Sequence, residues 1–362
     1  MIIKHLELVN FRNYTNLSLN FDKGINFIYG ENAKGKTNLV EAIYSLSLAR
    51  SFRTSSFYEM IQIGKTKGIV IGTFSDENYK KIVEINYLKN GKNVKINGNS
   101  IKKISELNKI LNVLYFVPKD TNLLKDVPKN RRQFINLNIA KINESYLQNI
   151  ILYEKLLKER NDALKAYKIN FTLLEIITNK IIDISYEIYK ERVNFFTQLS
   201  ELINEVYKNI SLIEDDKITI KFVPFINEKD KKEYELIASE LYKSNLEEDV
   251  KRKSTGIGIH KEDFRIYLNG KDVGVYGSQG ENRMITLSLK IAPYYLISEV
   301  KNKPIIILDD VLSELDAKHE ENLIHYLENF EQIFITNTRK SKFFNKKYYV
   351  VKNDTVLMEE EN

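Results

Sequence analysis

The sequence of 362 residues contains no cysteine. Disulfides, thiolate metal sites and cysteine nucleophiles are therefore excluded, and the composition suits a reducing compartment. A run of about 18 apolar residues, which a membrane-spanning helix would need, is also missing. The first residues lack the apolar region of a signal peptide. We therefore expect a cytoplasmic protein that does not span a membrane.

Histidine is scarce, and its four positions show no spacing typical of metal ligands: His5, His260, His319 and His325. Structural or surface roles are expected for His5, His319 and His325, whereas His260 belongs to a longer motif. The 43% hydrophobic content is enough for one large core or for two unequal lobes.

Glycine is absent from residues 99–255, which favours long helices there, since glycine marks turns and left-handed caps. One apolar stripe of helical spacing lies in this stretch: Ile177, Ile181, Ile184, Ile188, Phe195, Leu199, Leu202 and Val206. A second helix is predicted from Leu147, Ile150, Ile151, Leu157 and Leu164. The alternating residues 217–223 predict a strand. The helices could form a short antiparallel arm, too short for an extended coiled coil, or simply pack as core.

The strongest functional signal lies in a glycine-rich segment. It matches G-x-x-x-x-G-K-[ST], the phosphate-binding P-loop, with Gly30, Glu31, Asn32, Ala33, Lys34, Gly35, Lys36 and Thr37. Residues 25–29 predict a strand before it, and 37–50 have the spacing of a helix after it. Backbone N–H groups would surround the nucleotide phosphates. Lys36 would reach the β- and γ-phosphates and Thr37 would hold Mg²⁺. The pattern predicts binding of ATP or GTP.

Two carboxylates follow a buried strand near the C-terminus. Residues 305–308 are continuously apolar, as suits a central parallel strand, and Asp309 and Asp310 follow at its carboxyl end. Asp309 would hold Mg²⁺, and Asp310 would orient and polarise the attacking water. By itself such a pair would favour a helix cap or a turn. Gly30 and Asp309 lie so far apart in sequence that a large insertion in the nucleotide-binding fold is predicted.

A third motif precedes the acidic strand. Ser278, Gln279 and Gly280 stand where a helix should begin, with Ser278 as its N-cap and Met284, Leu287 and Ile291 facing inward. A free helix N-terminus can bind an anion. A P-loop, then S-x-G at a helix start, then an Asp-Asp strand is the order found in ABC-type ATPases. Residues 313–316 lie where those ATPases keep a loop that crosses the dimer interface.

These motifs together resemble the RecF family, bacterial recombination and repair ATPases related to SMC heads. The resemblance runs nearly end to end and rests on residues 11–14, 35–43, 51–53, 131–134, 158–161, 278–280 and 309–316. It implies that Arg12 contacts the nucleotide phosphates. It also implies that residues 131–132 enter a helical lobe and that 158–161 belong to its arm.

Some positions depart from the family pattern. Lys119 and Asn136 stand where carboxylates are usual, and Ile259 and Lys261 replace the proline and arginine of a G-P-H-R-D-D motif that includes His260. Pro293 falls within the helix after Ser278 and should bend it. None of these departures touches the P-loop, Ser278 or the Asp-Asp pair.

Positive charge is concentrated in the N-terminal third. The whole chain has a net charge of +6, and residues 1–132 hold 22 Lys and Arg against 11 Asp and Glu. Nine lysines are spread over predicted hairpins: Lys65, Lys67, Lys80, Lys81, Lys89, Lys92, Lys95, Lys102 and Lys103. Such a face would attract DNA without reading its sequence. Alternatively, these lysines could protect strand edges from aggregation.

The predicted fold is α/β, an ABC-type P-loop ATPase head with an inserted, mainly helical second lobe. We expect residues 1–130 to form the N-terminal part of the ATPase lobe, 131–250 the helical lobe and 251–362 the C-terminal part. The resemblance implies a weak, DNA-stimulated ATPase acting as a switch. Each nucleotide would lie between the P-loop of one subunit and Ser278-Gln279-Gly280 of another, in a homodimer.

By resemblance, the ATP-driven dimer binds single-stranded and duplex DNA at gaps or junctions and helps RecO and RecR load the recombinase. It would be located in the cytoplasm with the nucleoid. Two alternatives stay open from the motifs. A small-molecule P-loop kinase would need a compact acceptor pocket but not Ser278-Gln279-Gly280. Another SMC-like ATPase head would have a longer arm.

Overall fold

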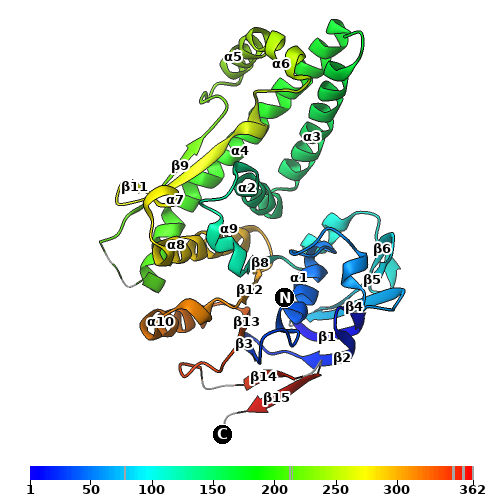
Figure 1. The fold of residues 1–362 in the computed structure, drawn as a ribbon, viewed down its shortest axis with the longest axis vertical. Helices are drawn as coiled ribbons and strands as arrows, with labels where there is room; N and C mark the ends of the chain where they lie inside the picture. The colour runs from blue at the N-terminus through cyan, green and yellow to red at the C-terminus, as the bar shows by residue number, and fades with distance from the viewer. Residues whose placement is uncertain (77–78, 212, 214, 345–346, 353–354, 361–362) are drawn as a thin grey trace. The chain divides into compact units, whose positions relative to one another are not determined.

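The computed structural model describes residues 1–76, 79–211, 213, 215–344, 347–352 and 355–360 (Figure 1). Its contacts divide the chain into two compact units. The first consists of Met1–Thr121, Glu205–Glu214 and Leu287–Asn362, and the second of Asn122–Asn204 and Asp215–Thr286. The insertion predicted from the distance between the P-loop and the acidic strand is confirmed. The finer division at residues 130 and 250 stays a prediction.

The first unit contains two six-stranded sheets. The antiparallel sheet has the order β2-β1-β4-β5-β6-β7, formed by Tyr14–Asn20, Ile2–Phe11, Lys67–Ser75, Lys80–Leu88, Gly91–Ile96 and Asn99–Ser100. The other has the order β15-β14-β3-β13-β12-β8, formed by Thr355–Glu360, Lys347–Lys352, Gly24–Tyr29, Gln332–Asn337, Ile305–Asp309 and Val113–Phe116. Its strands run parallel except for β15, which pairs antiparallel with β14.

Helix α1 (Lys36–Leu48) belongs to a core shared by both sheets. Its apolar residues Leu39, Val40, Ile43 and Leu46 are fully buried. Strand β12 is buried along its whole length, as its continuous apolar sequence predicted. This unit also contains α9 (Pro293–Val300) and α10 (Ala317–Leu327), with 3₁₀ turns at Tyr58–Met60, Ile104–Lys109, Pro118–Asn122 and Leu312–Glu314. Because strands β3, β13 and β12 run parallel, their carboxyl ends lie at one edge of the sheet. This is the edge at which α/β sheets bind ligands.

The second unit is mainly helical. Its helices are α2 (Pro128–Ile142), α3 (Glu144–Lys165), α5 (Lys231–Ser244), α6 (Leu246–Arg252) and the short α7 (Val273–Tyr276), with a 3₁₀ turn at Ile259–Lys261. Most of α4 (Phe171–Ser211) and the start of α8 (Gln279–Ile291) also belong to it. A three-stranded antiparallel sheet has the order β11-β10-β9, formed by Lys271–Asp272, Asp263–Leu268 and Ile218–Val223.

The helical stripe read from the sequence is confirmed as α4, 41 residues long. Its predicted apolar residues are buried except Leu202, which is half-buried. The helix predicted around residues 147–164 is confirmed as α3; of the apolar residues that indicated it, Ile150 and Leu164 are buried, whereas Ile151 is exposed. The buried face carries Tyr146, Tyr153 and Arg160 beside the aliphatic residues. Apolar spacing alone missed it because tyrosine and arginine also bury much apolar surface.

The helix after Ser278, which was predicted to bend at Pro293, is interrupted there. Helix α8 ends at Ile291 and α9 begins at Pro293, because proline lacks the N–H that a continuous helix requires. Met284, Leu287 and Ile291 are buried, as their spacing predicted. Within the described part of the chain, no helix is both long enough and apolar enough to cross a membrane.

Candidate nucleotide site

The P-loop connects β3 to α1 and is packed closely against the turn between β1 and β2. Gly35 has φ +111°, and a Cβ atom there would meet Asn13 Nδ2 at 2.5 Å and the Tyr14 hydroxyl at 2.8 Å. The Tyr14 hydroxyl donates a hydrogen bond to the Gly35 carbonyl (3.1 Å). Only glycine fits this position, both for its backbone angle and for the space available. Contacts with the turn between β1 and β2 therefore fix the P-loop without any contribution from a ligand.

Lys36 lies at the first turn of α1, directly after that glycine. Its Nζ donates to the carbonyls of Gly30 (2.7 Å) and Glu31 (2.8 Å), so the ammonium spans the loop. Burial lowers the pKa of Lys36, and the charges of Asp310 and Asp309 oppose that shift. Lys36, Asp309 and Asp310, all three predicted from the sequence, thus lie close enough for their charges to affect one another.

Thr37 and Asp309 come together although 272 positions separate them. The Thr37 hydroxyl lies 3.1 Å from each carboxylate oxygen of Asp309. The hydroxyl of Thr336, at the end of β13, donates to Asp309 Oδ1 (2.6 Å). Burial raises the pKa of Asp309, while the hydrogen bonds from Thr336 and Thr37 act in the opposite direction. The neighbouring ends of three parallel strands, with α1, therefore build this site.

The donor set fits a hard divalent cation. A threonine hydroxyl and a single buried carboxylate supply oxygen atoms, which Mg²⁺ prefers, and Mg²⁺ usually keeps several water ligands. Among the described residues there is no group of three or more His, Asp or Glu side chains that could form a protein-only metal cage. Thr37 and Asp309 are thus suited to a cation that also takes ligands from water and phosphate.

Asp310 follows in an uncommon backbone conformation, with φ +51°. Its N–H lies 3.2 Å from the Thr336 carbonyl and 3.0 Å from the Thr336 hydroxyl, which hold it there. A non-glycine residue at positive φ is uncommon and is found at functional sites when its surroundings enforce it. The turn directs the chain away from β12 directly after Asp309.

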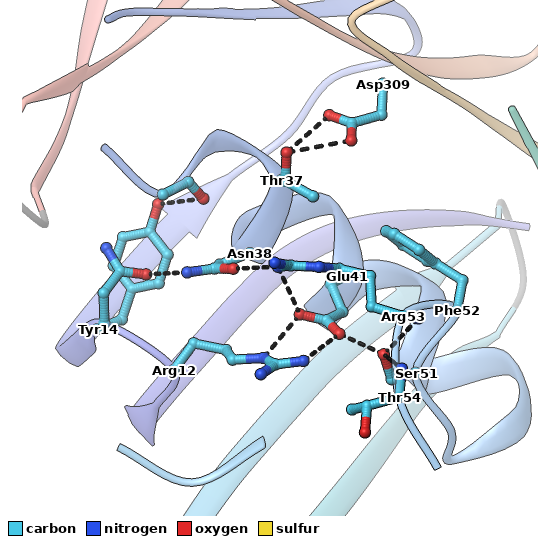
Figure 2. A network of polar contacts seen from close by, with 12 residues as sticks. Arg12, Tyr14, Thr37, Asn38, Glu41, Ser51, Phe52, Arg53, Thr54 and Asp309 are labelled. Atoms are coloured by element: carbon cyan, nitrogen blue, oxygen red, sulfur yellow. Dashed lines mark hydrogen bonds and ion pairs between the residues drawn. The ribbon is translucent and has the colours of Figure 1, made fainter. Parts of the chain in front are cut away.

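A network of polar contacts surrounds the first turns of α1 (Figure 2). The buried carboxylate of Glu41 accepts two hydrogen bonds from Arg12, at 2.9 and 2.7 Å, and one from the Ser51 hydroxyl. Arg53 Nη1 lies 3.6 Å from the same carboxylate and donates to Asn38 Oδ1 (2.8 Å). Arg12, implied by resemblance to contact phosphate, is therefore held by Glu41 within reach of the P-loop helix.

Sequence reasoning missed Thr336, and it included Glu41 and Arg53 only within residues 35–43 and 51–53 of the family resemblance, without a role in this site. Glu41 is the one charged residue within the otherwise apolar residues 39–43, which could have indicated a buried ion pair. Thr336 ends a buried strand, where α/β sheets place their ligands. Nothing in the local sequence indicated that Arg53 would return to α1.

The Ser278-Gln279-Gly280 motif lies in the second unit, at the start of α8. The Ser278 hydroxyl accepts from the Glu281 N–H (3.2 Å), which confirms the N-cap predicted for Ser278. All three motif residues are exposed. Downstream in the first unit, Asp316 caps α10 by accepting from Lys318 N and His319 N, both at 3.0 Å.

The lysines of the predicted hairpins fall on β4–β6 and their flanking turns, confirming the hairpins. Lys92 does not belong to an open basic face, because its Nζ donates to the Ala49 carbonyl and lies 4.9 Å from the centre of the Phe57 ring. Burial lowers the pKa of Lys92 to about 8. Lys95 is paired with Glu84 (3.5 Å). Exposed members of the set include Lys65, Lys67, Lys80, Lys89, Lys102 and Lys103.

The arginines carried by the helical motifs make contacts inside the second unit. Arg131 forms a bidentate pair with Asp263, at 2.7 Å for both bonds. Arg160 donates to Asp249 and Thr255, both at 2.7 Å. Arg132 donates to the Glu262 carbonyl (2.9 Å). These side chains join the helices to the segment that leads into β10.

The departures from the family pattern are accommodated locally. Asn136 Oδ1 accepts from Arg192 (2.9 Å), so an amide serves where a carboxylate is usual. Lys119 donates to the Phe52 carbonyl (2.8 Å). Ile259 is buried, whereas Lys261 is exposed. His260 accepts a hydrogen bond from the Tyr153 hydroxyl at Nδ1 (2.8 Å), because its Nε2–H faces the Thr255 carbonyl (3.2 Å).

Comparison with known proteins identifies close similarity over nearly the whole chain. The family model described as RecF/RecN/SMC N terminal domain matches residues 2–360. A DNA replication and repair protein RecF from Clostridium perfringens (strain SM101 / Type A) is 36% identical over 335 residues, 92% of each chain. One from Bacillus cereus (strain AH820) is 37% identical over 345 residues, 93% of this chain and 92% of that protein.

Solved structures of RecF proteins are also similar to this chain. The structure titled as the recombination mediator protein RecF-ATPrS in the RecFOR pathway has a TM-score of 0.90 and 33% identity, covering 99% of this chain and 98% of the other. A RecF-ATP structure matches with the same TM-score and identity, covering 99% and 97%. A head of Smc bound to a domain of ScpA, at 16% identity and TM-score 0.60, shares the fold.

Proposed function

Because the chain belongs to the RecF family of DNA replication and repair proteins, we propose that it is an ATP-dependent switch that dimerises on DNA during recombinational repair and replication-fork maintenance. The observation that carries this proposal is the meeting of Lys36, Thr37 and Asp309 at the end of β12. Relatives whose structures are titled as ATP complexes support the choice of ATP over GTP.

In this proposal, the P-loop binds the phosphates of ATP. Lys36 exchanges its two loop carbonyls for phosphate oxygens, and the N–H groups at the start of α1 face the same anions. Thr37 and Asp309 hold Mg²⁺, which neutralises phosphate charge when bound. Arg12, positioned by Glu41, adds a further cation. Asp310 orients the attacking water, and its enforced backbone turn suits a fixed role.

A second subunit completes the nucleotide-binding site. Gln279, Gly280 and the N-cap residue Ser278 are exposed at the start of α8, where the γ-phosphate of the partner's ATP can bind. Two such sites make a symmetric interface in which both nucleotides join the subunits. ATP binding therefore closes the dimer on DNA, and slow hydrolysis opens it. DNA stimulates this hydrolysis by favouring the closed form.

Exposed lysines on β4–β6 and their flanking turns provide the contact with DNA. They are spread along strand ends and turns rather than forming a pocket, which suits the phosphate backbone of single or double strands at gaps and junctions. RecO and RecR are the proposed partners in loading the recombinase, in line with the RecFOR pathway named for similar structures. The location that follows is the cytoplasm, with the nucleoid.

The two-subunit mechanism is tested by mixing two inactive variants. Ser278→Arg places a bulky side chain where the partner's γ-phosphate must approach, and Lys36→Met removes the P-loop ammonium. Each alone should lack ATPase activity. Their mixture forms heterodimers that contain one intact composite site, so part of the activity should return. A kinase-like monomer shows no such rescue, and absence of rescue despite demonstrated mixing contradicts the proposal.

DNA binding is tested by salt dependence. Affinity for unrelated duplex sequences should be similar and should fall steeply with salt. Changing Lys80, Lys81, Lys102 and Lys103 to Glu should weaken DNA binding while ATP binding persists. The matched control changes Lys229, Lys232, Lys251 and Lys253 of the second unit to Glu. Equal loss in both variants, or affinity that does not depend on salt, contradicts the assignment of this face.

A further inference from the structure

The exposed N-terminus of α8 already binds a carboxylate. Ser278 N–H donates to Glu281 Oε2 (2.7 Å), while Glu281 N–H donates to the Ser278 hydroxyl (3.2 Å). This reciprocal arrangement is a capping box, in which the third helical residue reaches back to the capping residue. Contacts with Ser278 lower the pKa of Glu281, so its side chain carries a full negative charge at neutral pH.

The backbone around Ser278 is fixed, whereas the side chain of Glu281 is exposed. Asn282 is buried and donates from Nδ2 to the carbonyls of Gly277 and Ser278, both at 2.9 Å. Asn282 Oδ1 is buried and has no hydrogen-bond partner among the described residues. A Cβ atom on Gly277 would meet the Val273 carbonyl at 2.6 Å, so the backbone just before Ser278 is closely packed. The group that can move is the carboxylate.

Two anions therefore compete for the same donor. In the proposed two-subunit site, the γ-phosphate of the partner's ATP approaches the start of α8, where a carboxylate on the Ser278 N–H occupies a backbone donor and repels the phosphate. We propose that Glu281 is a built-in competitor of the γ-phosphate, which must turn away from Ser278 before two subunits can close, and which thereby sets the ATP concentration needed for dimerisation. This inference rests on the two-subunit function proposed above.

The substitution Glu281→Gln removes the negative charge while keeping the hydrogen bond that caps the helix. The amide oxygen of Gln can still accept from Ser278 N–H, but it does not repel phosphate, so the helix start is retained. The ATP concentration for half-maximal dimerisation, measured by sedimentation velocity on the full-length protein, should fall about tenfold, as expected for removing one nearby charge. The difference from wild type should shrink at high salt. Glu281→Asp keeps the charge and should stay near the wild-type midpoint.

The matched control is Glu233→Gln. Glu233 is the corresponding third residue after the N-cap Asp230 of α5, is exposed, and lies in the same unit. Its substitution removes one charge from an equivalent helix position and should leave the midpoint unchanged. ATP affinity at protein concentrations too low for dimerisation should be equal in all four proteins, because the P-loop is untouched.

The possible outcomes distinguish this inference from the function on which it rests. A wild type that dimerises with ATP, together with a Glu281→Gln midpoint that is unshifted or shifted only as much as that of Glu233→Gln, overturns the inference alone. A wild type that shows no ATP-dependent dimer overturns the proposed function and this inference with it. A reduced midpoint for Glu281→Gln but not for Glu281→Asp supports both.

Discussion

Cationic side chains meet carboxylates in both units, but in different ways. In the second unit, Arg160 and Arg192 are 1% and 2% exposed and are tied to side-chain and backbone acceptors. At the P-loop, Lys36 is also buried, at 8% exposure, but its partners are two loop carbonyls, and Arg53 is 46% exposed. A buried cation with several fixed partners holds helices together. A cation at the edge of a sheet, with partners it can exchange, can bind a ligand.

The arginines of the second unit have fixed partners inside that unit. Arg131 carries a positive charge, yet it is largely buried and bound to both oxygens of Asp263, so it is not available to contact DNA. Breaking such a pair would leave a buried charge without compensation. Its role in this structure is to join α2 to β10. The exposed lysines of the first unit are the better candidates for DNA.

Lys36→Met should have the largest effect, because it removes a cation whose partners are exchangeable. ATP binding should become undetectable by equilibrium dialysis, since the β- and γ-phosphates lose the ammonium of the P-loop. Thermal unfolding should stay close to wild type, because the side chain holds only loop carbonyls. Unchanged ATP affinity would contradict the assignment of the site.

Asp310→Asn should affect turnover and not binding. The amide keeps the shape of the side chain but loses the charge that polarises water, so hydrolysis should fall by about 10²–10⁴-fold. The ATP-bound dimer should persist longer in sedimentation. Asp309→Asn is the matched control and should instead weaken binding of Mg²⁺-ATP, since Asp309 is paired with Thr37. Normal turnover in Asp310→Asn would remove that residue from the mechanism.

Arg160→Met should act on stability rather than on ATP binding. It leaves Asp249 buried without its guanidinium, which should lower the free energy of unfolding by about 3–5 kcal/mol. The double variant Arg160→Met with Asp249→Leu should recover part of that loss, because no charge remains buried. Denaturant unfolding measures both. A single variant as stable as wild type would show that the pair is not structural.

His260 should make the second unit sensitive to acid. Burial lowers the pKa of His260 to about 4, below the value of about 6.5 expected in an unfolded chain. The unfolded state therefore takes up the proton first, and stability should fall as the pH drops from about 6.5 to about 4, by up to about 3 kcal/mol. Urea unfolding at several pH values checks this. His260→Gln should flatten that part of the profile, and an unaltered slope in this variant would assign the effect to other groups.

Much of the nucleotide site could be predicted because its residues form short local motifs. The P-loop needs glycine at fixed positions for its backbone angles, and Lys36 and Thr37 follow within the same turn. Continuous apolar sequence predicted the buried strand before Asp309 and Asp310, and Pro293 predicted the helix break. The capping role of Ser278 followed from residue type at a helix start. In each case the physical cause acts over a few residues.

Only the tertiary structure decided which distant residues share a site. Thr336 meets Asp309 because β12 and β13 pair in parallel register, and Arg53 returns to Asn38 through a segment without regular periodicity. The sequence likewise could not show that the Lys92 ammonium bonds to a backbone carbonyl, whereas other lysines in similar sequence contexts are exposed. Local motifs determine what chemistry a chain can offer. Strand register and packing, which depend on contacts far apart in sequence, determine which charges become ligands and which become structural supports.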